Sequence, residues 1–268
     1  MKGIVLSLRN IFAVFEKELK SYFVSPIAYV VIALFLGITG IFFYIYVARF
    51  AQLSAIPPQQ AFQFGIPQNL NINLMVIRFL LQNMSLFALF WLPLITMRLY
   101  SEEKKTGTIE LLLTSPITNL QIVLGKFAAA VTIYLIMLAL TFFYHSFLFM
   151  YGNPELKPIL VGYLGLFLLG STYIAYGILF SSTTENQIVA AVETFAFILL
   201  FWVIGWISEY FGPTLGNFLS NFSIIDHFDD FSKGVLDTKN VIFYLSFIVM
   251  GIYLTYVQVE STRWRGSQ

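Results

Sequence analysis

Glu193 is the ionisable residue that lies deepest inside a long apolar stretch of this chain. Burying an unpaired carboxylate in such a stretch is costly, so by default the residue suggests a functional site. It follows Gln187 by six positions, which is about 9 Å along a helix. Asn186 and Ala190 share its helical face, which predicts an intramembrane polar patch. Two interpretations stay open: a substrate or proton site, and the structural clamp that we favour, with Glu193 protonated or paired with Arg98.

The rest of the sequence contains few residues or motifs that could support catalysis. It contains no cysteine and no G-x-x-x-x-G-K-[ST] loop, which excludes thiol chemistry and P-loop nucleotide binding. His145 and His227 lack the i,i+4 spacing of a helical metal pair, and we interpret His145 as a satisfied interface histidine. Asp226, Asp229 and Asp230 are interpreted as a solvated helix face, with a cation site as the alternative. We therefore expect no enzyme activity, and no metal or cofactor bound by this chain.

The composition is that of a membrane protein. Hydrophobic residues make up 58% of the 268 residues and charged residues 11%, against about 25% charged in soluble domains. A net charge of +1 gives no reason to expect a nucleic-acid partner. Several apolar stretches approach the roughly 20 residues that cross a hydrocarbon core. We expect an all-α membrane protein, with residues 1–268 as one transmembrane domain and spans at about 26–47, 74–97, 119–150, 158–180, 188–207 and 241–257.

Local signals mark the ends of these spans. Ser25 followed by Pro26 predicts a helix N-cap with proline in the first turn, and Thr118 with Gln121 predicts a capping box. Pro93 removes a backbone hydrogen bond, so we expect a kink near the end of the second span.

The distribution of lysine and arginine predicts the orientation. With the N-terminus inside, ten basic residues lie on the inner side and five on the outer side, which favours cytosolic termini. The inner residues are Lys2, Arg9, Lys17, Lys20, Arg98, Lys104, Lys105, Lys126, Arg263 and Arg265. The outer residues are Arg49, Arg78, Lys157, Lys233 and Lys239. We interpret Arg78 as a side chain that extends toward the outer interface.

Residues 11–23 predict an amphipathic helix that precedes the first span. The apolar positions that share one helical face are Ile11, Phe12, Phe15, Leu19, Tyr22 and Phe23. Glu16, Lys17 and Lys20 lie opposite, which is the pattern of a helix lying along the inner leaflet.

The outer segment 208–240 predicts a second short helix. Ser223 is placed to cap toward Asp226, apolar residues recur at helical spacing, and Gly234 is the expected stop. We interpret this helix as dipping back toward the membrane, where it offers a surface to an outer-face protein partner.

The charge-rich connection 98–118 is the strongest lead to a function. It lies between two apolar spans and carries charges of both signs, from Glu102 to Lys105. Gly107 loosens the chain, and 108–113 then predicts a short apolar turn that Ser115-Pro116 ends. Leucines at 111–113 in an aqueous loop need cover from lipid, from other spans or from a partner's groove. We predict that Ile109, Leu111 and Leu112 insert in a partner's groove and that the charges set its register.

Several of these segments together resemble a known family. They are residues 16–23 (EKELKSYF) followed by Ser25-Pro26, 93–98 (PLITMR), 101–117 (SEEKKTGTIELLLTSPI), Gly125-Lys126, 184–187 (TENQ) and 227–234 (HFDDFSKG). The chain resembles permease subunits of ABC-2 type ABC transporters, and within them the gliding-motility, GldF-like branch. The resemblance covers nearly the whole length.

The resemblance implies six helices, an N-terminal elbow helix and a separate cytosolic ABC ATPase that binds ATP and Mg²⁺. By position, Thr106 to Leu113 would form the coupling helix and 11–23 the elbow, with Phe12, Phe15, Leu19 and Phe23 on its apolar face. The residues expected to couple to the ATPase are Glu102, Glu103, Thr106, Gly107, Thr108, Ile109, Glu110, Leu111 and Leu112. Glu193 matches no motif of the family.

The leading functional hypothesis is therefore a permease subunit of an ATP-driven exporter in a bacterial cytoplasmic membrane, linked to gliding motility in the branch it resembles. A second permease, identical or paralogous, is expected. The transporter would have two ATPase subunits, and one permease chain offers only one coupling loop to them. One alternative is a mechanotransmitter or scaffold that is driven by the ATPase without transport. The other is an ion-coupled secondary carrier that uses Glu193, disfavoured because the sequence shows no internal repeat.

Overall fold

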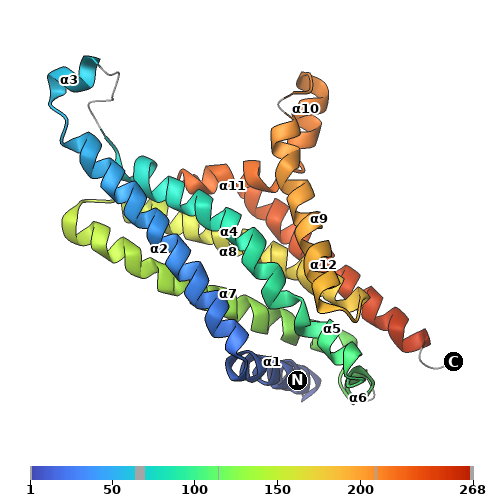
Figure 1. Ribbon diagram of the computed structural model, residues 1–268. Coiled ribbons are helices and arrows are strands. Elements are labelled where there is room, and N and C mark those ends of the chain that lie inside the picture. The colour runs from blue at the N-terminus through green and yellow to red at the C-terminus, as the bar shows by residue number, and fades with distance from the viewer. Residues whose placement is uncertain (1, 64–69, 114, 209, 266–268) are drawn as a thin grey trace.

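The computed structural model describes residues 2–63, 70–113, 115–208 and 210–265, and these ranges contain helices and no strands (Figure 1). The predicted all-α class is confirmed. Six helices are long and apolar enough to cross a membrane, as predicted. They are α2 (Pro26–Ser54), the continuous run of η1 (Asn73–Ile77), α4 (Arg78–Thr96) and α5 (Arg98–Lys105), α7 (Asn119–Tyr151), α8 (Leu156–Thr183), α9 (Gln187–Ser208) and α12 (Thr238–Arg265).

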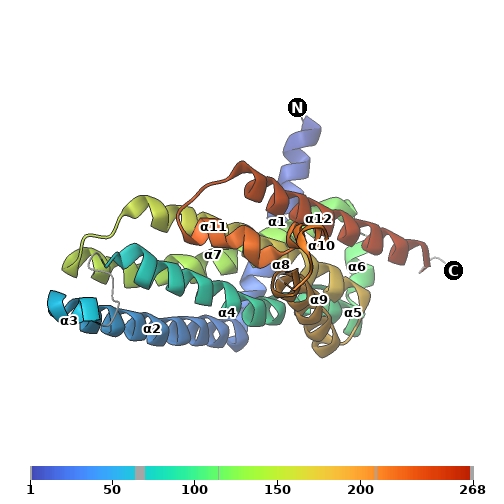
Figure 2. The same cartoon turned by 90° about the horizontal axis from the view of Figure 1, so that it is seen from above.

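The remaining helices lie at the two ends of this bundle (Figure 1). Helix α1 (Lys2–Val24) lies crosswise at the end where α5 and α6 (Ile109–Leu113) are found, and Figure 2 shows it running across the long helices. We call this the loop end. Helices α3 (Pro58–Gln63), α10 (Pro213–Ser220) and α11 (Ile224–Ser232) lie toward the opposite end, the far end.

Helix starts follow the capping residues in the sequence. The Ser25 side chain accepts from the Ile27 amide at 3.4 Å, with proline next to the cap, and Thr118 forms the predicted capping box with Gln121. Ser223 accepts from the Asp226 amide at 3.2 Å, and Gly234 follows α11 with a φ of +82°. These contacts are local, so the sequence alone predicts them.

Three features of the fold were not predicted. Helix α1 begins at Lys2 instead of near residue 11, and the far end carries α3 and α10 in addition to α11. Helix α8 also continues to Thr183, past the end expected for the fourth span at about residue 180.

Helix α8 forms the centre of the bundle and is the most buried of the six long helices. Its glycines allow close approach: a Cβ at Gly170 would lie 2.1 Å from the Tyr134 ring, and one at Gly177 would lie 2.1 Å from Thr96 Oγ1. Small residues let helix backbones pack tightly in a membrane. Helix α8 is thereby held against both α7 and α4, and its last turn is fixed beside the charged loop.

Candidate functional site

The charged connection is two short helices with a tight turn between them. Helix α5 continues the line of α4 through Met97, whose amide donates to the Pro93 carbonyl at 2.9 Å, and α6 begins at Ile109. Gly107 has a φ of +71°, and its amide donates to the Lys104 carbonyl at 3.1 Å. A glycine just past a helix end adopts this left-handed conformation without steric strain. The expected coupling helix over 106–113 is therefore wrong at its start, because 106–108 form the turn that ends α5.

Ser181 joins the start of α5 to the end of α8. Its Oγ accepts from the Tyr100 amide at 3.0 Å and from the Ser101 amide at 3.2 Å, and it donates to the Met97 carbonyl at 2.8 Å. The first amides of a helix lack partners within that helix. Lys104 adds a second link, because its Nζ donates to the Ser182 carbonyl at 2.5 Å. Helix α5 is thus attached to the central helix at two points.

Lys126 of α7 is fully buried where three helices meet. Its Nζ lies 2.8 Å from Glu18 Oε1 of α1, 2.9 Å from Glu103 Oε2 of α5, and 2.6 Å from the Leu99 carbonyl, to which it donates. The same nitrogen lies 4.8 Å from the centre of the Tyr100 ring.

Lys17 completes this network. Its Nζ lies 2.7 Å from Glu103 Oε1 and 3.3 Å from Glu18 Oε1. Lys126, Glu18, Glu103 and Lys17, which we call the Lys126 cluster, therefore contain two positive and two negative charges. Buried ions stay charged only when they are paired in this way.

The pKa values of Glu18 and Lys17 favour the charged forms of these two residues. Burial alone would raise the pKa of the Glu18 carboxyl, but Lys126 and Lys17 outweigh it and hold that pKa below its ordinary value. Burial opposes the charge of Lys17 in the same way, while Glu103 and Glu18 raise its pKa. Because each charge depends on its neighbours, the cluster links α1, α5 and α7 as one unit.

Gly125 brings α1 close enough for these ion pairs to form. A Cβ at this position would lie 2.7 Å from Val14 Cβ, and real Cβ atoms do not approach so closely. Val14, Glu18 and Tyr22 form the buried stripe of α1 at helical spacing. The glycine that precedes Lys126 therefore lets α7 contact the same stripe that carries Glu18.

A second contact holds α1 against the junction of α4 and α5. The Tyr22 hydroxyl donates to the Ile95 carbonyl at 2.8 Å. Arg98 donates through Nη2 to Ser21 Oγ at 2.8 Å, and its guanidinium lies 5.3 Å from the centre of the Tyr22 ring. Helix α1 is thus bound to the loop through Arg98 as well as through the Lys126 cluster.

The apolar face expected for the first helix is only partly buried. Phe12 is 61% exposed and Phe23 is 38% exposed, whereas Phe15 and Leu19 pack partly against the core. The protein side of α1 is the Val14–Glu18–Tyr22 stripe, which carries one charge, whereas Glu16, Lys17 and Lys20 are exposed. The exposed phenylalanines remain available to lipid.

The loop residues proposed to meet a partner divide into engaged and exposed groups. Leu111 is 73% exposed, Ile109 packs partly against the core, and Glu103 is mostly buried in the Lys126 cluster. Glu103 therefore faces inward, contrary to the expectation that it contacts a partner. The other expected residues that are exposed are Glu102, Thr106, Gly107, Thr108 and Glu110. The side chains of Leu112 and Leu113 lie outside the described part of the structure.

Glu193 is exposed on the surface of α9, and the polar patch expected inside the bundle is not present there. Its Oε2 accepts from the Thr183 hydroxyl at 3.4 Å. Asn186 instead caps α9, because its Oδ1 accepts from the Ile188 amide at 2.9 Å. Ala190 is buried, and Arg98 contacts Ser21, so the expected pairing of Arg98 with Glu193 is also wrong. A helix turns about 100° per residue, so positions 186, 190 and 193 straddle the edge between buried and exposed surface.

The histidines and far-end carboxylates have structural partners. His145 is buried with its Nδ1 3.2 Å from the Tyr163 hydroxyl, and His227 Nδ1 lies 2.6 Å from Asn240 Oδ1. Asp229 pairs with Arg78, so Arg78 does more than extend to the interface. Among the described residues no group of three His, Cys, Asp or Glu side chains is placed to hold a metal ion.

Sequence reasoning included Glu18 and Lys126 in the segments of the resemblance and counted Lys126 among the inner positive charges, but it gave neither residue a role. The available signal was the position of Lys126 eight residues into an otherwise apolar helix, since a charge there requires a partner. The partner could not be identified, because Glu18 lies 108 positions away in the chain.

Comparison with known proteins identifies the class of the chain. A family model described as ABC-2 family transporter protein matches residues 51–257. This range includes the charged loop, Lys126 and Glu103, whereas Lys17 and Glu18 precede it. A search of curated proteins found no match.

Proposed function

Because this chain belongs to the ABC-2 family of transporter proteins, we propose that it is the permease subunit of an ATP-driven exporter. In this proposal a separate cytosolic ABC ATPase binds ATP and Mg²⁺ and drives the permease through the loop end. The chain itself supplies the membrane path and the contact surface.

The Lys126 cluster is the observation that carries this proposal. A force applied to α6 passes through the short turn to α5, which is bound to α7 by Lys126 and to α1 by Glu103 and Lys17. Ser181 and Lys104 link α5 to α8. Loosening any of these contacts would expose a buried charge or leave helix amides unpaired, both of which are unfavourable. The loop end therefore moves as one body, and displacement of the loop reaches the long helices.

The ATPase would contact the exposed tip of the loop. Leu111 is a large exposed apolar side chain in a short helix, and Glu102, Lys105 and Glu110 of the same loop are exposed and carry charges of both signs. An apolar anchor within a charged rim is a common arrangement for protein recognition. We place this tip in a groove of the ATPase.

The remaining parts of the proposal concern the membrane and the second subunit. Both termini would be cytosolic, in a bacterial cytoplasmic membrane, as the excess of lysine and arginine at the loop end supports. A second permease, identical or paralogous, would supply the second coupling loop. Helices α2 and α9 are the least buried spans together with α12, so they have apolar surface for lipid or for that subunit. A link to gliding motility rests on the resemblance of the sequence alone.

The ion-coupled carrier is the weaker alternative. It required Glu193 to lie in a polar patch of the bundle, whereas the residue is exposed and the neighbouring Ala190 is buried. A mechanotransmitter that uses the same coupling contacts without export is distinguished by measuring solute efflux together with ATPase activity.

The coupling proposal is tested by co-purification of the permease with its ABC ATPase. We expect Leu111→Asp to abolish co-purification, because a charge replaces the apolar anchor. Leu215→Asp changes a leucine of similar exposure, 60%, at the far end, and should leave the complex intact. Retention of the ATPase by the Leu111→Asp variant at the wild-type ratio would show that the loop tip is not the coupling contact.

A further inference from the structure

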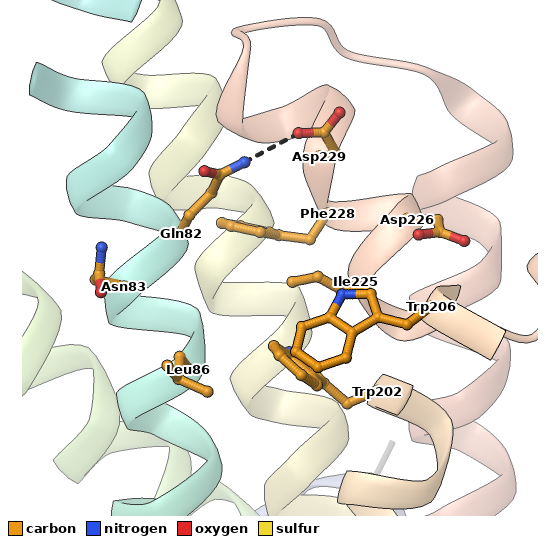
Figure 3. Close-up of a pocket in the computed structure, with 9 residues that line it drawn as sticks. All are labelled: Gln82, Asn83, Leu86, Trp202, Trp206, Ile225, Asp226, Phe228 and Asp229. Atoms are coloured by element: carbon orange, nitrogen blue, oxygen red, sulfur yellow. Dashed lines mark hydrogen bonds between the residues drawn. The ribbon is translucent and has the colours of Figure 1, made fainter. Parts of the chain in front are cut away.

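Helix α4 borders two hollows at the far end of the bundle. The cavity in Figure 3 lies between α4, α9 and α11 and is lined by carboxylates, amides and apolar side chains. Beside it, Arg78 and Lys233 are both paired with Asp229. The smaller hollow, which we call the groove, lies between α2, η1 and α4 and is lined by Tyr46, Arg49, Phe50, Met75 and Phe79. Four of these five side chains are large and mainly apolar, and the fifth is a cation.

Two stacked rings form one wall of the groove. The ring centroids of Tyr46 and Phe79 are 5.9 Å apart, and the ring planes are inclined by 30°. Asn83, which Figure 3 shows on α4 at the edge of the cavity, donates through Nδ2 to the Tyr46 hydroxyl at 2.5 Å. The polar end of Tyr46 is thereby held by the protein, and its ring is left to the groove.

A π-helical turn forms the opposite wall. Met75 lies in η1, where the Arg78 amide donates to the Asn73 carbonyl five positions back. Asn73 is itself fixed, because its side chain donates to the Glu155 carbonyl at 3.0 Å and accepts from the Glu155 amide at 3.1 Å. Turns of this kind are rare inside helices and are frequent at functional sites. The groove is therefore formed by contacts that require no ligand.

Arg49 lies at the level of the lipid headgroups. It follows Pro26, the first residue of α2 at the loop end, by 23 positions, which is about 35 Å along a helix. An average tilt of about 20° reduces this height to about 33 Å. The hydrocarbon core is about 30 Å thick, so the Arg49 guanidinium lies just beyond it, where lipid phosphates are found.

Arg49 also has no ionic partner among the described residues, and its side chain is exposed. Glu155 lines an adjoining hollow together with Phe50, but its carboxylate forms no ion pair with Arg49. A guanidinium stays charged and presents donors in a planar fork that fits phosphate oxygens. An arginine at the edge of an apolar groove thus suits an anion that carries an apolar chain.

We propose that the groove binds one acyl chain of a membrane phospholipid whose phosphate lies against Arg49. The groove has a volume of about 280 Å³, whereas sites that enclose a whole small molecule usually have about 300–1,000 Å³. It therefore holds a segment of one chain between the aromatic rings and Met75, and the rest of the lipid stays in the bilayer.

The test is native mass spectrometry of the full-length protein released from dodecyl maltoside, which counts bound lipids and protein copies in one spectrum. The probes are phosphatidylglycerol and diacylglycerol with the same palmitoyl and oleoyl chains, so they differ only in the phosphate headgroup. We expect phosphatidylglycerol to bind about fivefold more tightly, because one basic residue attracts the phosphate. Equal affinity for the two probes would overturn the proposal.

Two variants locate the binding. Arg49→Gln should weaken phosphatidylglycerol binding about fivefold and leave diacylglycerol binding unchanged, because it removes only the charge. Phe79→Ala should weaken binding of both probes about threefold, because it removes one ring of the wall. Melting temperature checks that each variant is folded, and the exposed position of Arg49 makes unfolding of its variant unlikely to interfere.

The matched control is Lys157→Gln, which removes an exposed charge at the far end outside the groove and should leave both affinities unchanged. Equal weakening of phosphatidylglycerol binding by Lys157→Gln and Arg49→Gln would show a general attraction of the lipid to positive charge and would overturn the proposal. So would wild-type phosphatidylglycerol affinity in folded Arg49→Gln.

A second copy of this chain is the competing occupant of the groove. If Arg49→Gln and Phe79→Ala abolish a dimer peak while lipid binding is unchanged, another copy covers the groove and the lipid proposal is wrong. If lipid binding falls and the dimer fraction is unchanged, the lipid is the occupant. None of these measurements involves the ATPase, so their outcome is independent of the coupling proposal.

Discussion

At the loop end, Lys126 is fully buried between Glu18 and Glu103, whereas at the far end Arg78 and Asp229 remain about one-third exposed. Both clusters join helices by charge pairs of similar length. The difference is solvent: water and ions can replace a partner at the far end, but they have no access to Lys126. The same chemistry therefore makes a rigid joint at the loop end and an adaptable one beside the cavity.

The largest expected effect comes from removing Lys126. The Lys126→Met substitution keeps the shape but leaves two buried carboxylates beside each other, so we expect a loss of about 3–5 kcal/mol of stability. Arg78→Met at the far end should lose about 1 kcal/mol or less. Thermal unfolding in detergent measures both. Equal losses would show that burial does not distinguish the two clusters.

Acid should weaken the loop end through Glu18. Its pKa is lowered in the fold, so its ion pairs stabilise fully above the ordinary carboxyl value of 4.5 and that stabilisation is lost as the pH falls through the folded pKa. We expect Glu18→Gln to cost about 3 kcal/mol at pH 7. The difference in melting temperature between wild type and the Glu18→Gln variant should become smaller as the pH falls below 4.5. A gap that stays constant between pH 7 and pH 3.5 would contradict the ionised cluster.

Gly125→Ala tests the contact that brings α1 to α7. The added methyl overlaps Val14 Cβ at 2.7 Å, and overpacking of this kind costs about 1–3 kcal/mol. The double variant Gly125→Ala with Val14→Gly should recover part of that loss, because removing Val14 Cβ makes room for the methyl group. A double-mutant cycle on melting temperature provides the measurement. If the losses of melting temperature in the two single variants add up to the loss in the double variant, the two residues are not in contact.

The smallest effect is expected at Glu193. Its side chain is exposed and bonds only weakly to Thr183, so Glu193→Gln should shift the melting temperature by less than about 2 °C. ATPase activity of the complex should also remain close to wild type. Loss of turnover at unchanged stability would restore the ion-coupled interpretation of this residue.

The sequence predicted the parts of the fold that depend on neighbouring residues. Ser25, Thr118 and Ser223 cap their helices through amides two or three positions away, and six long apolar stretches are readable from composition. The capping of α5 could not be predicted in this way, because Ser181 is brought to Tyr100 by the packing of α8.

The role of the charged loop as a contact surface stays a prediction, and the sequence did not predict the contacts that hold the loop in place. The charges and leucines of the loop indicated a contact surface, and Gly107 indicated the turn. Which loop charges face inward depends on Glu18 and Lys126, since only the assembled helices turn Glu103 away from solvent. Glu193 was overvalued for a related reason: an apolar stretch shows that a charge is unusual, but it does not show which side of the helix is covered.

The ion pair of Glu18 with Lys126 also has a consequence for how the chain is made. The two residues are 108 positions apart, and at about 5–20 residues per second a ribosome needs roughly 5–20 s to synthesise the chain between them. Throughout that interval the first helix has been made but its lysine partner has not. Because Phe12 and Phe23 are exposed, the nascent helix can bind the membrane surface through these side chains until Lys126 has been synthesised. Docking of this helix then marks the moment at which the third span has entered the bilayer.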